Sequence, residues 1–538
     1  MLSLTRDEFL AVAAREAAAS PGATLAIPVS LRLLSDQITP VSAYRRLVAP
    51  DERTAPSFLL ESVENGDRQG RHSIMGSRPS IEVVAHGREV AVRRRGEEAR
   101  GSREDDPLLV PRRLTAGWRL VRPAEHPRAR LPRCALGGWF GFASYDTVRY
   151  AEPEKLAPTR APPDDRGLPD LHFSYYGGVV VFDHVDRVAH VIRLVEAEAD
   201  AGRDAWARAF DAAAAEIDAI AARLETPPAQ PGFRLGRLSR EAAAPKQPVS
   251  NITREEHARM VARAKEYIAS GDIFQVVIGQ RFERRSAADP FDVYRALRTV
   301  NPSPYMVYMQ GEGTILVASS PEILCRVRRE TERGALVVTN RPLAGTRPRG
   351  ATAEEDEALE RDLLADDKER AEHIMLVDLG RNDVGRVCEP RTVRLPAVMR
   401  VERYSHVMHI SSTVTGELRE GLDCWDALRA ALPVGTISGA PKIRAMQVID
   451  ELEPVRRGPY GGGMGYAGLD GEMDIALALR TIVAPTGQRT AEGWAYHLQA
   501  AGGIVADSRA ESEYDETVNK AAALARAIDL AESAFGAG

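Results

Sequence analysis

The sequence has few cysteines, no long apolar run and no excess of positive charge. Its 538 residues include 4 cysteines that form no Cys-x-x-Cys pair, which argues against a zinc ribbon or a disulfide framework and for a reducing compartment. The formal net charge is -6, so the composition gives no support to nucleic-acid binding. No stretch approaches the ~18 apolar residues of a membrane span. The start of the chain carries early acidic residues and is not typical of a secretory signal. We therefore expect a cytoplasmic protein that binds neither nucleic acid nor membrane.

Several catalytic motifs are also absent from the sequence. It contains no recognisable Ser-His-Asp or Cys-His arrangement and no Gly-x-Cys-x-Gly elbow of a glutaminase. The segment from Gly463 to Gly468 matches G-x-G-x-x-G, but a turn and a strand-like run, Ile475 to Val483, follow it. A dinucleotide site needs a helix there, so NAD binding is disfavoured. His406 and His409 would point to opposite faces of a strand, which disfavours a shared zinc ion.

The length is sufficient for two or three domains. The stretch 226–251 is rich in Pro and polar residues and is the best linker candidate. It divides the chain into residues 1–240 and residues 251–538. The sequence shows no internal repeat and no βαβ alternation, which disfavours a doubly wound parallel sheet. We expect an α+β fold with large, mostly antiparallel β-sheets.

Local signals place some elements within this frame. Residues 57–63 and 177–182 are predicted strands, and the charged stretch 100–107 is predicted to be a surface loop. Thr253 and Glu256 have the spacing of a capping box and predict the start of a helix.

Two Glu-x-x-Glu pairs lie far apart in the C-terminal half: Glu369 with Glu372, and Glu513 with Glu516. Both segments are predicted helices, and a spacing of three puts each pair on one helix face. Spacing alone favours two solvated faces, because Glu is common on surface helices. If the faces met, four carboxylates would gather, which is costly in an interior without a hard cation. Mg²⁺ is the natural candidate because it prefers oxygen ligands.

Two glycine-containing turns offer hydrogen-bond donors for an anion. Residues 435–442 contain hydroxyls and free amides ahead of a helix, and residues 500–505 form a second such turn. The first turn is equally typical of a capped helix start. Together with Arg480 and Lys520, these donors suit a substrate that bears two carboxylates.

The order of several motifs along the chain identifies a family resemblance. These motifs are residues 59–62, 301–306, 320–322, 341–350, 372–383, 435–442 and 519–520. They resemble the chorismate-utilising enzymes, and most closely the anthranilate synthase branch. That family has a fold of two large β-sheets packed face to face with helices outside. Its activity in this branch converts chorismate and ammonia to anthranilate and pyruvate.

The resemblance also implies roles for individual residues. Glu372 and Glu516 would bind Mg²⁺, supported by Glu369 and Glu513 through water. The substrate-binding and catalytic positions would be Thr436 and the amides of Gly502 and Gly503 at the ring carboxylate, Tyr460 and Arg480 at the enolpyruvyl carboxylate, Lys520 nearby, and His409 at the C4 hydroxyl.

Two positions separate the branches of the family. Relatives that add water at C2 resemble this chain but have a lysine base where Gln275 stands, and a neutral amide cannot deprotonate water. Aminodeoxychorismate synthase has a nucleophilic lysine where Ala344 stands, and alanine offers no nucleophile. A non-catalytic tryptophan-sensing subunit is a third alternative. It is disfavoured because the metal and acid positions are all present.

The resemblance implies partners and regulation as well. A separate glutamine amidotransferase subunit would supply ammonia, in a heterotetramer, and residues 1–240 would form a tryptophan-sensing region. The expected inhibitor pocket consists of Leu59, Glu61, Ser62, Pro304, Tyr305, Met306, Gly465 and Tyr466. Without the resemblance, an edge strand packed on a core turn would be the favoured interpretation of the first of these segments.

Overall fold

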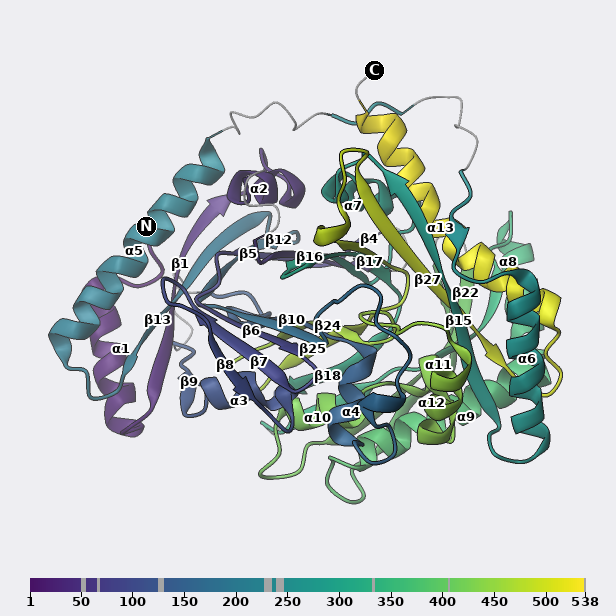
Figure 1. Ribbon diagram of the computed structural model, residues 1–538. Helices are drawn as coiled ribbons and strands as arrows, with labels where there is room; N and C mark the ends of the chain where they lie inside the picture. Colours follow the sequence, from purple (N-terminus) through teal and green to yellow (C-terminus); the bar gives the residue numbers. More distant parts are fainter. Residues whose placement is uncertain are drawn as a thin grey trace.

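The computed structural model describes residues 1–49, 55–64, 68–123, 130–226, 235–238, 246–330, 334–404 and 407–536. Two large sheets dominate the fold (Figure 1). In spatial order, the 13-stranded sheet contains β14 (Val249–Ser250), β15 (Gln275–Ser286), β27 (Trp494–Ile504), β26 (Thr481–Pro485), β17 (Thr314–Ser320), β16 (Tyr305–Gly311), β2 (Ser57–Glu61), β5 (His72–Ser77), β12 (Gly178–Asp183), β13 (Val188–Glu198), β1 (Thr24–Leu34) and β9 (Trp118–Leu120), and β23 (Gly439–Ala440) pairs with β15.

The second sheet has 12 strands. Its order is β20 (Leu343–Pro348), β22 (Val407–Glu417), β19 (Leu336–Asn340), β18 (Ile323–Arg329), β25 (Met473–Leu477), β24 (Gly463–Ala467), β10 (Gly138–Ala143), β11 (Leu171–Tyr176), β6 (Ile81–His86), β7 (Glu89–Arg94) and β8 (Arg100–Arg103), and β21 (Arg394–Arg403) pairs with β22. A two-stranded ribbon joins β3 (Val63–Glu64) and β4 (Arg68–Gln69). Pairing is antiparallel in the described strands apart from the parallel pair β1–β9.

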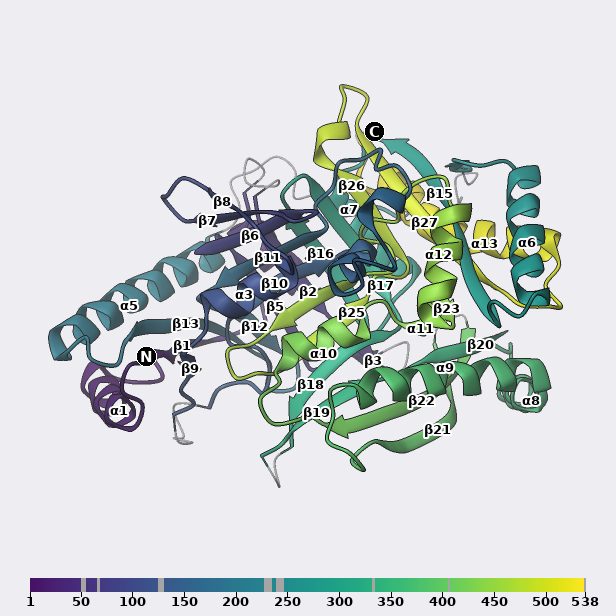
Figure 2. The same ribbon diagram turned by 60° about the horizontal axis from the view of Figure 1, so that its bottom comes forward.

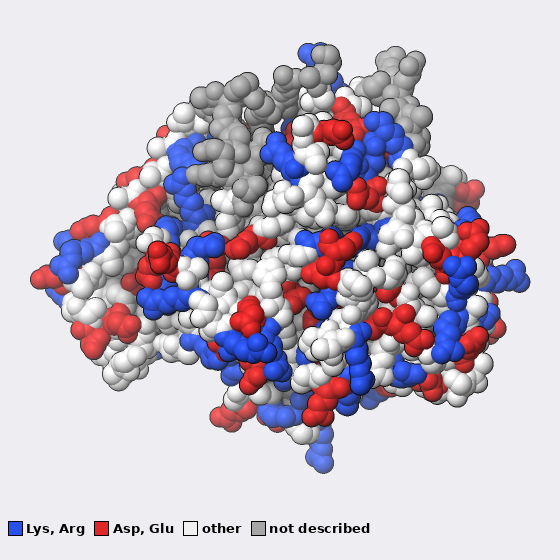
Figure 3. All heavy atoms as spheres, viewed as in Figure 1, with Lys and Arg blue, Asp and Glu red and all other residues white. Residues whose placement is uncertain are grey.

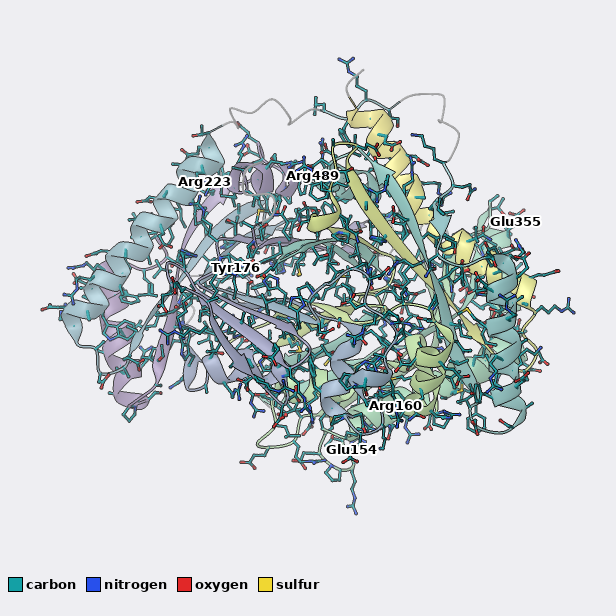
Figure 4. The ribbon with its side chains drawn as sticks, in the orientation of Figure 1. Glu154, Arg160, Tyr176, Arg223, Glu355 and Arg489 are labelled. Atoms are coloured by element: carbon teal, nitrogen blue, oxygen red, sulfur yellow. The ribbon has the colours of Figure 1, made fainter. Side chains whose placement is uncertain are left out.

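Aromatic and aliphatic side chains from both sheets fill the space between them. Phe58 of β2 stacks on Phe140 of β10, with ring centroids 4.0 Å apart. Tyr176 of β11 meets Phe58 edge-on and lies among the strands near the centre of the molecule in Figure 4. Leu316 and Met464 belong to the same buried cluster. The strands therefore bury one face of each sheet against the other, and the expected α+β sandwich is confirmed.

Helices cover the outer faces of the two sheets. They are α1 (Arg6–Ala19), α2 (Pro40–Leu47), α3 (Val110–Leu114), α4 (Val148–Ala151), α5 (Arg203–Glu225), α6 (Arg254–Ala269), α7 (Pro290–Val300), α8 (Ala353–Ala365), α9 (Asp367–Gly385), α10 (Cys424–Ala431), α11 (Gly435–Ser438), α12 (Lys442–Leu452) and α13 (Ala510–Phe535). Apolar residues of α1, α5, α7 and α13 pack on the larger sheet, whereas those of α9 and α10 pack on the smaller one. In the described part of the chain, none of these helices is long and apolar enough to cross a membrane.

Both sheets run through the two regions expected from the sequence. β2 pairs with β16, and β10 pairs with β24, so strands of residues 1–240 continue sheets built by residues 251–538. Figure 1 shows the early strands on the left and the late strands on the right of the same sheets. The expected boundary near residue 240 lies outside the described residues, which resume at 246.

Local predictions fare differently at two positions. The capping box is confirmed: Thr253 Oγ1 accepts from the Glu256 amide at 3.1 Å, and the Thr253 amide donates to Glu256 Oε2 at 2.7 Å. The predicted loop 100–107 is wrong in part, because Arg100–Arg103 forms β8 and pairs with β7. All four residues of β8 are exposed, so this edge strand has no apolar alternation by which its sequence could reveal it.

A buried ion pair joins several segments between the sheets. The Arg457 side chain is 2% exposed, and its guanidinium donates to Glu453 Oε1 at 2.6 Å. It also donates to the carbonyls of Ile437 at 2.6 Å and Val277 at 2.7 Å. Glu453 accepts the Gly279 amide at 2.7 Å. Burial is tolerated here because each charged group has several close partners.

Arg457→Met should lower the free energy of unfolding by about 3–5 kcal/mol, because it leaves Glu453 buried without its cation. Arg103→Met removes an exposed pair with Glu89 and should cost at most about 1 kcal/mol. Urea denaturation at neutral pH measures both changes. Equal, small losses would contradict the proposed contribution of Arg457.

Candidate active site

The two Glu-x-x-Glu pairs lie on α9 and α13, and their charges act on one another. Burial raises the pKa of Glu372 to about 7. The carboxylates of Glu369, Glu513 and Glu516 add to this increase, and Lys368 opposes it. Burial and neighbouring carboxylates, Glu516 among them, also raise the pKa of Glu369. The fold therefore brings the two predicted helix faces into the same electrostatic environment. In Figure 2, α9 runs along the strands of the smaller sheet that include β22.

Lysine side chains partner two of these carboxylates. Lys368 Nζ lies 3.9 Å from Glu372 Oε1, and Lys520 Nζ lies 2.5 Å from Glu516 Oε1. Among the residues that the structure describes, no three His, Cys, Asp or Glu side chains gather closely enough to hold a metal ion. The carboxylate oxygens fit a hard cation by their chemistry.

The predicted glycine turn at residues 500–505 is wrong, because Gly502 and Gly503 belong to β27 and pair with Ile278 and Val277 of β15. These two glycines bring the strand backbone against the site. A Cβ on Gly502 would lie 3.0 Å from Glu513 Oε2, and a Cβ on Gly503 would lie 2.7 Å from Gln275 Nε2. Lys520 Nζ donates to the carbonyl of Ala501 at 2.9 Å. A side chain at Gly503 would displace Gln275, so the close approach of β15, β27 and α13 depends on small residues here.

Gln275 stands at the start of β15. Its side chain is 5% exposed, and its Oε1 has no hydrogen-bond partner within the described part of the chain. A buried amide oxygen without a partner is costly. The structure therefore places an unsatisfied neutral acceptor beside Gly503 of β27, at the position expected to separate the family branches.

Thr436 and Glu322 form a hydrogen-bonded pair in the same region. The Thr436 hydroxyl on α11 donates to Glu322 Oε1 at 2.9 Å. Burial raises the pKa of Glu322 to about 8, and hydrogen bonds from Thr436 and the Leu343 amide oppose the increase. Glu322 is therefore protonated at neutral pH and has a proton to give.

Sequence reasoning did not single out Glu322, which appears there only as the end of a motif. The available signal was an acidic residue placed directly between two apolar strands, β17 and β18. An acidic residue in a solvated turn between strands has the same local sequence pattern. Only the burial of Glu322, which is 3% exposed, distinguishes a functional site from such a turn.

His409 lies on β22, directly opposite Thr346 of β20. Its Nδ1 is 2.9 Å from the carbonyl oxygen of Gly345 and 3.1 Å from Thr346 Oγ1. A carbonyl only accepts, so Nδ1 carries the proton and Nε2 remains an acceptor. Burial lowers the pKa of His409 to about 4, and Arg480 and Lys520 contribute to the decrease. The imidazole is therefore neutral. Its former motif partner, His406, lies outside the described residues.

Arg480 connects β25 and β26, which belong to different sheets. The expectation of one strand from Ile475 to Val483 is therefore wrong, because the chain crosses between the sheets there. Arg480 has φ +47°, a left-handed conformation that is uncommon for a residue with a side chain. No carboxylate lies within ion-pair distance of its guanidinium among the described residues. Burial lowers the pKa of Arg480, and Tyr460 and Glu516 oppose the decrease. A half-buried cation without a salt bridge fits an anionic ligand.

Tyr460 shares the environment of Arg480. Its side chain is 3% exposed, and burial raises its pKa, with a hydrogen bond involving the Ala501 backbone opposing the increase. The phenol thus lies between the Arg480 crossover and the end of β27. Among the predicted substrate positions, Gly502 and Gly503 lie at the end of β27, Lys520 binds the Ala501 carbonyl, and Arg480 acts electrostatically on Tyr460. Thr436 forms its hydrogen bond with Glu322.

A separate cavity of about 240 Å³ lies between β2, β16 and β24. The expected inhibitor positions that line it are Glu61, Ser62, Pro304, Tyr305, Met306, Gly465 and Tyr466. Leu59 does not line it. Strand alternation turns Leu59 into the helix-covered core, where it is fully buried, and brings Leu60 to the cavity.

The Glu61 carboxylate in this cavity already has partners. Glu61 Oε2 accepts from the Tyr294 hydroxyl at 2.7 Å and lies 2.8 Å from Arg298 Nε. Arginines 71, 133, 326 and 328 also line the cavity. Arg326 and Arg328 are each 3.0 Å from Asp474 Oδ2. A ligand with both an ammonium and a carboxylate would meet groups of both signs.

Comparisons with known proteins cover almost the whole chain. Residues 60–526 match the family described as chorismate binding enzyme. Anthranilate synthase alpha subunit 1, chloroplastic, of Oryza sativa subsp. indica is 50% identical over 99% of this chain and 93% of that protein. Anthranilate synthase component 1 of Pseudomonas putida is 44% identical over 98% of this chain and 99% of that protein. Because the rice relative is chloroplastic, the compartment expected from the sequence stays a prediction.

Solved structures share this architecture. Anthranilate synthase component I from Streptococcus pneumoniae TIGR4 has a TM-score of 0.69 and 34% identity, covering 92% of this chain and 99% of that chain. MenF, the menaquinone-specific isochorismate synthase from Escherichia coli, has a TM-score of 0.60 at 18% identity, covering 97% of this chain and 100% of that chain, and shows the fold alone. With family, relatives and fold in agreement over most of its length, the chain belongs to the chorismate-binding enzymes.

Proposed function

We propose that this chain is the large subunit of an anthranilate synthase. It converts chorismate and ammonia to anthranilate and pyruvate, the first committed step of tryptophan biosynthesis. The neutral amide of Gln275 beside Gly503 carries the proposal, because the branch that adds water has a lysine base at this position. The names of the relatives, at 44–50% identity over almost the full chain, support it.

The donors around the end of β27 hold the two carboxylates of chorismate. Thr436 and the amides of Gly502 and Gly503 receive the ring carboxylate, and Tyr460 and Arg480 receive the enolpyruvyl carboxylate. Lys520 adds positive charge beside them. Arg480 suits this role because it is half-buried and forms no salt bridge with a carboxylate among the described residues. Fixing both carboxylates orients C2 and C4 for reaction.

Ammonia then forms a bond to C2 while the C4–oxygen bond breaks. Glu322, protonated at neutral pH, is matched to give a proton to the leaving hydroxyl. Neutral His409 presents Nε2 and orients that hydroxyl as an acceptor. Loss of the C2 proton to solvent and cleavage of the bond between C3 and the enolpyruvyl oxygen leave the aromatic amine. The enolpyruvyl methylene takes up a proton as pyruvate is released.

Glu372 and Glu516 are the proposed Mg²⁺ ligands, with Glu369 and Glu513 supporting them through water. Burial and the charge of Glu516 raise the pKa of Glu369, Glu372 and Glu513, which supports this assignment. Bound Mg²⁺ supplies positive charge that attracts the ring carboxylate of chorismate. Lys368 lies close to Glu372, and Lys520 lies close to Glu516, so the two lysines partially neutralise these carboxylates.

Glu372→Gln or Glu516→Gln should raise the Mg²⁺ concentration needed for half-maximal activity by at least about tenfold, because even groups that only support metal ligands cost 10–100-fold when changed. Titrating activity with Mg²⁺ measures this. Glu357→Gln, at an exposed position of α8, is the matched control and should titrate like the unchanged protein. Normal Mg²⁺ dependence in both active-site variants would remove these residues from the metal site.

The alternative activities lack the required groups. Ala344, paired with Ile410 beside His409, provides no nucleophile for aminodeoxychorismate synthesis. A non-catalytic sensing subunit has no need of the carboxylate set and the buried Glu322, all of which are present.

The nitrogen source distinguishes this chain from its proposed partner. The purified chain should form fluorescent anthranilate from chorismate, Mg²⁺ and ammonium, but none from glutamine, because no glutaminase nucleophile motif is present. Adding a glutamine amidotransferase subunit, with which it forms a heterotetramer, should restore the use of glutamine. Glutamine-dependent activity of the chain alone, or isochorismate as the product, would contradict the proposal.

Tryptophan is the proposed feedback ligand of the 240 Å³ cavity. Residues 1–240 supply β2, and the later part of the chain supplies β16 and β24, so the ligand would contact both regions. The Tyr466 ring and the apolar residues of β16 can cover an indole. The ammonium would join or replace the contacts that Glu61 makes with Arg298 and Tyr294.

Ser62→Arg should fill this cavity and raise the tryptophan concentration for half-inhibition by more than about tenfold, equivalent to about 1.4 kcal/mol. Uninhibited activity should change little. Anthranilate formation against tryptophan concentration measures the effect, and Ser102→Arg on the exposed edge strand β8 is the control. An unchanged inhibition curve in the Ser62 variant would place the tryptophan site elsewhere.

A further inference from the structure

His409 occupies the middle of a three-stranded arrangement. Thr346 of β20 lies directly opposite it on one side, and Glu402 of β21 lies directly opposite it on the other. The contacts with Gly345 and Thr346 fix the position of Nδ1 in the His409 ring. A ring that is fixed at one atom can still tilt, so the direction of Nε2 depends on the side chain that packs against the ring.

The Tyr404 ring provides this packing. Its centroid is 5.6 Å from that of His409, and the two planes meet at 60° in an edge-to-face arrangement, a favourable geometry for aromatic pairs. Tyr404 follows β21, and its amide donates to the Val407 carbonyl at 2.8 Å, which brings it next to β22. Phenol and imidazole therefore pack together at the end of the hairpin.

The hydroxyl end of Tyr404 is also fixed. It donates to Glu402 Oε2 at 3.0 Å. The other oxygen, Glu402 Oε1, accepts from Arg341 and Ser411. Glu402 is thus held on three sides, and its position determines where the Tyr404 hydroxyl can lie. Tyr404 therefore links the anchored Glu402 carboxylate to the His409 ring.

We infer that Tyr404, anchored by Glu402, is a positioning residue that holds the His409 ring with Nε2 directed at the substrate. The inference rests on the proposed function. Tyr404 itself makes no bond to the reacting atoms. Its effect on the rate passes through His409, and removing it should have no further effect once the imidazole is gone.

Four variants test this: Tyr404→Leu, Tyr404→Phe, His409→Ala, and the double variant that combines Tyr404→Leu with His409→Ala. Tyr404→Leu should lower kcat on the order of 10²-fold, the scale of a small misplacement in an active site. The KM for chorismate and the Mg²⁺ dependence should be little changed. Tyr404→Phe keeps the ring, loses one hydrogen bond, and should lower kcat by only about 2- to 10-fold.

The double variant gives the decisive measurement. It should be no slower than His409→Ala alone, because two groups that act through one another are not additive. Tyr175→Leu is the matched control: it removes another buried phenol, whose hydroxyl donates to Glu196 at 2.8 Å. Any loss of rate in this control should multiply with that of His409→Ala.

Each outcome decides between the alternatives. If Tyr404→Leu slows the His409→Ala protein as much as the unchanged protein, or leaves the unchanged protein at full rate, the inference is wrong. If Tyr404→Leu does not fold, Tyr404→Phe and Glu402→Gln provide the same comparison on intact protein. Full activity of His409→Ala would overturn the inference and the proposed role of His409 together. If the unchanged protein formed no anthranilate, the proposed function itself would be wrong, whatever the variants did.

Discussion

The buried guanidinium of Arg457 is the contact on which the arrangement of the active site depends. It binds Glu453 and the carbonyls of Ile437 and Val277. Ile437 follows Thr436 on α11, and Val277 lies two residues beyond Gln275 on β15. A charge in the interior is stable only when its donors are satisfied, so these segments have little freedom to move apart. The helix α11, which carries Thr436, and the strand β15, which carries Gln275, are thereby fixed to each other.

The shared sheets connect the proposed tryptophan cavity to the proposed chorismate site. Tyr305 of β16 lines the cavity and pairs with Ser320 of β17, two residues before Glu322. Gly465 and Tyr466 of β24 also line it, and the same segment begins shortly after Tyr460. A ligand in the cavity therefore contacts strands whose ends carry catalytic groups. Two discrete arrangements of such strands would be enough to couple the sites.

Charge balance explains why the chorismate site is both acidic and basic. Figure 3 shows acidic and basic side chains interspersed over the visible face. In the proposed site, the acidic side chains would bind the cation and the basic side chains would bind the substrate. Burial and neighbouring carboxylates raise the pKa of Glu369, Glu372 and Glu513, whereas burial, Arg480 and Lys520 lower the pKa of His409. A cation for the first group and a dianionic substrate for the second relieve both repulsions. Outlying residues such as Glu355, which projects from α8 in Figure 4, take no part in this balance.

The sequence by itself determined the α+β class, the capping box at Thr253 and the helical faces that carry each Glu-x-x-Glu pair, because these follow from local periodicity. The tertiary structure alone decided that α9 and α13 share one electrostatic environment, that Leu60 replaces Leu59 at the cavity, and that β8 is a strand. It also decided the protonation of Glu322 and the contact of Tyr404 with His409. Local periodicity predicts the face of a helix or strand on which a side chain lies. Burial and long-range strand pairing determine which other residues contact that face.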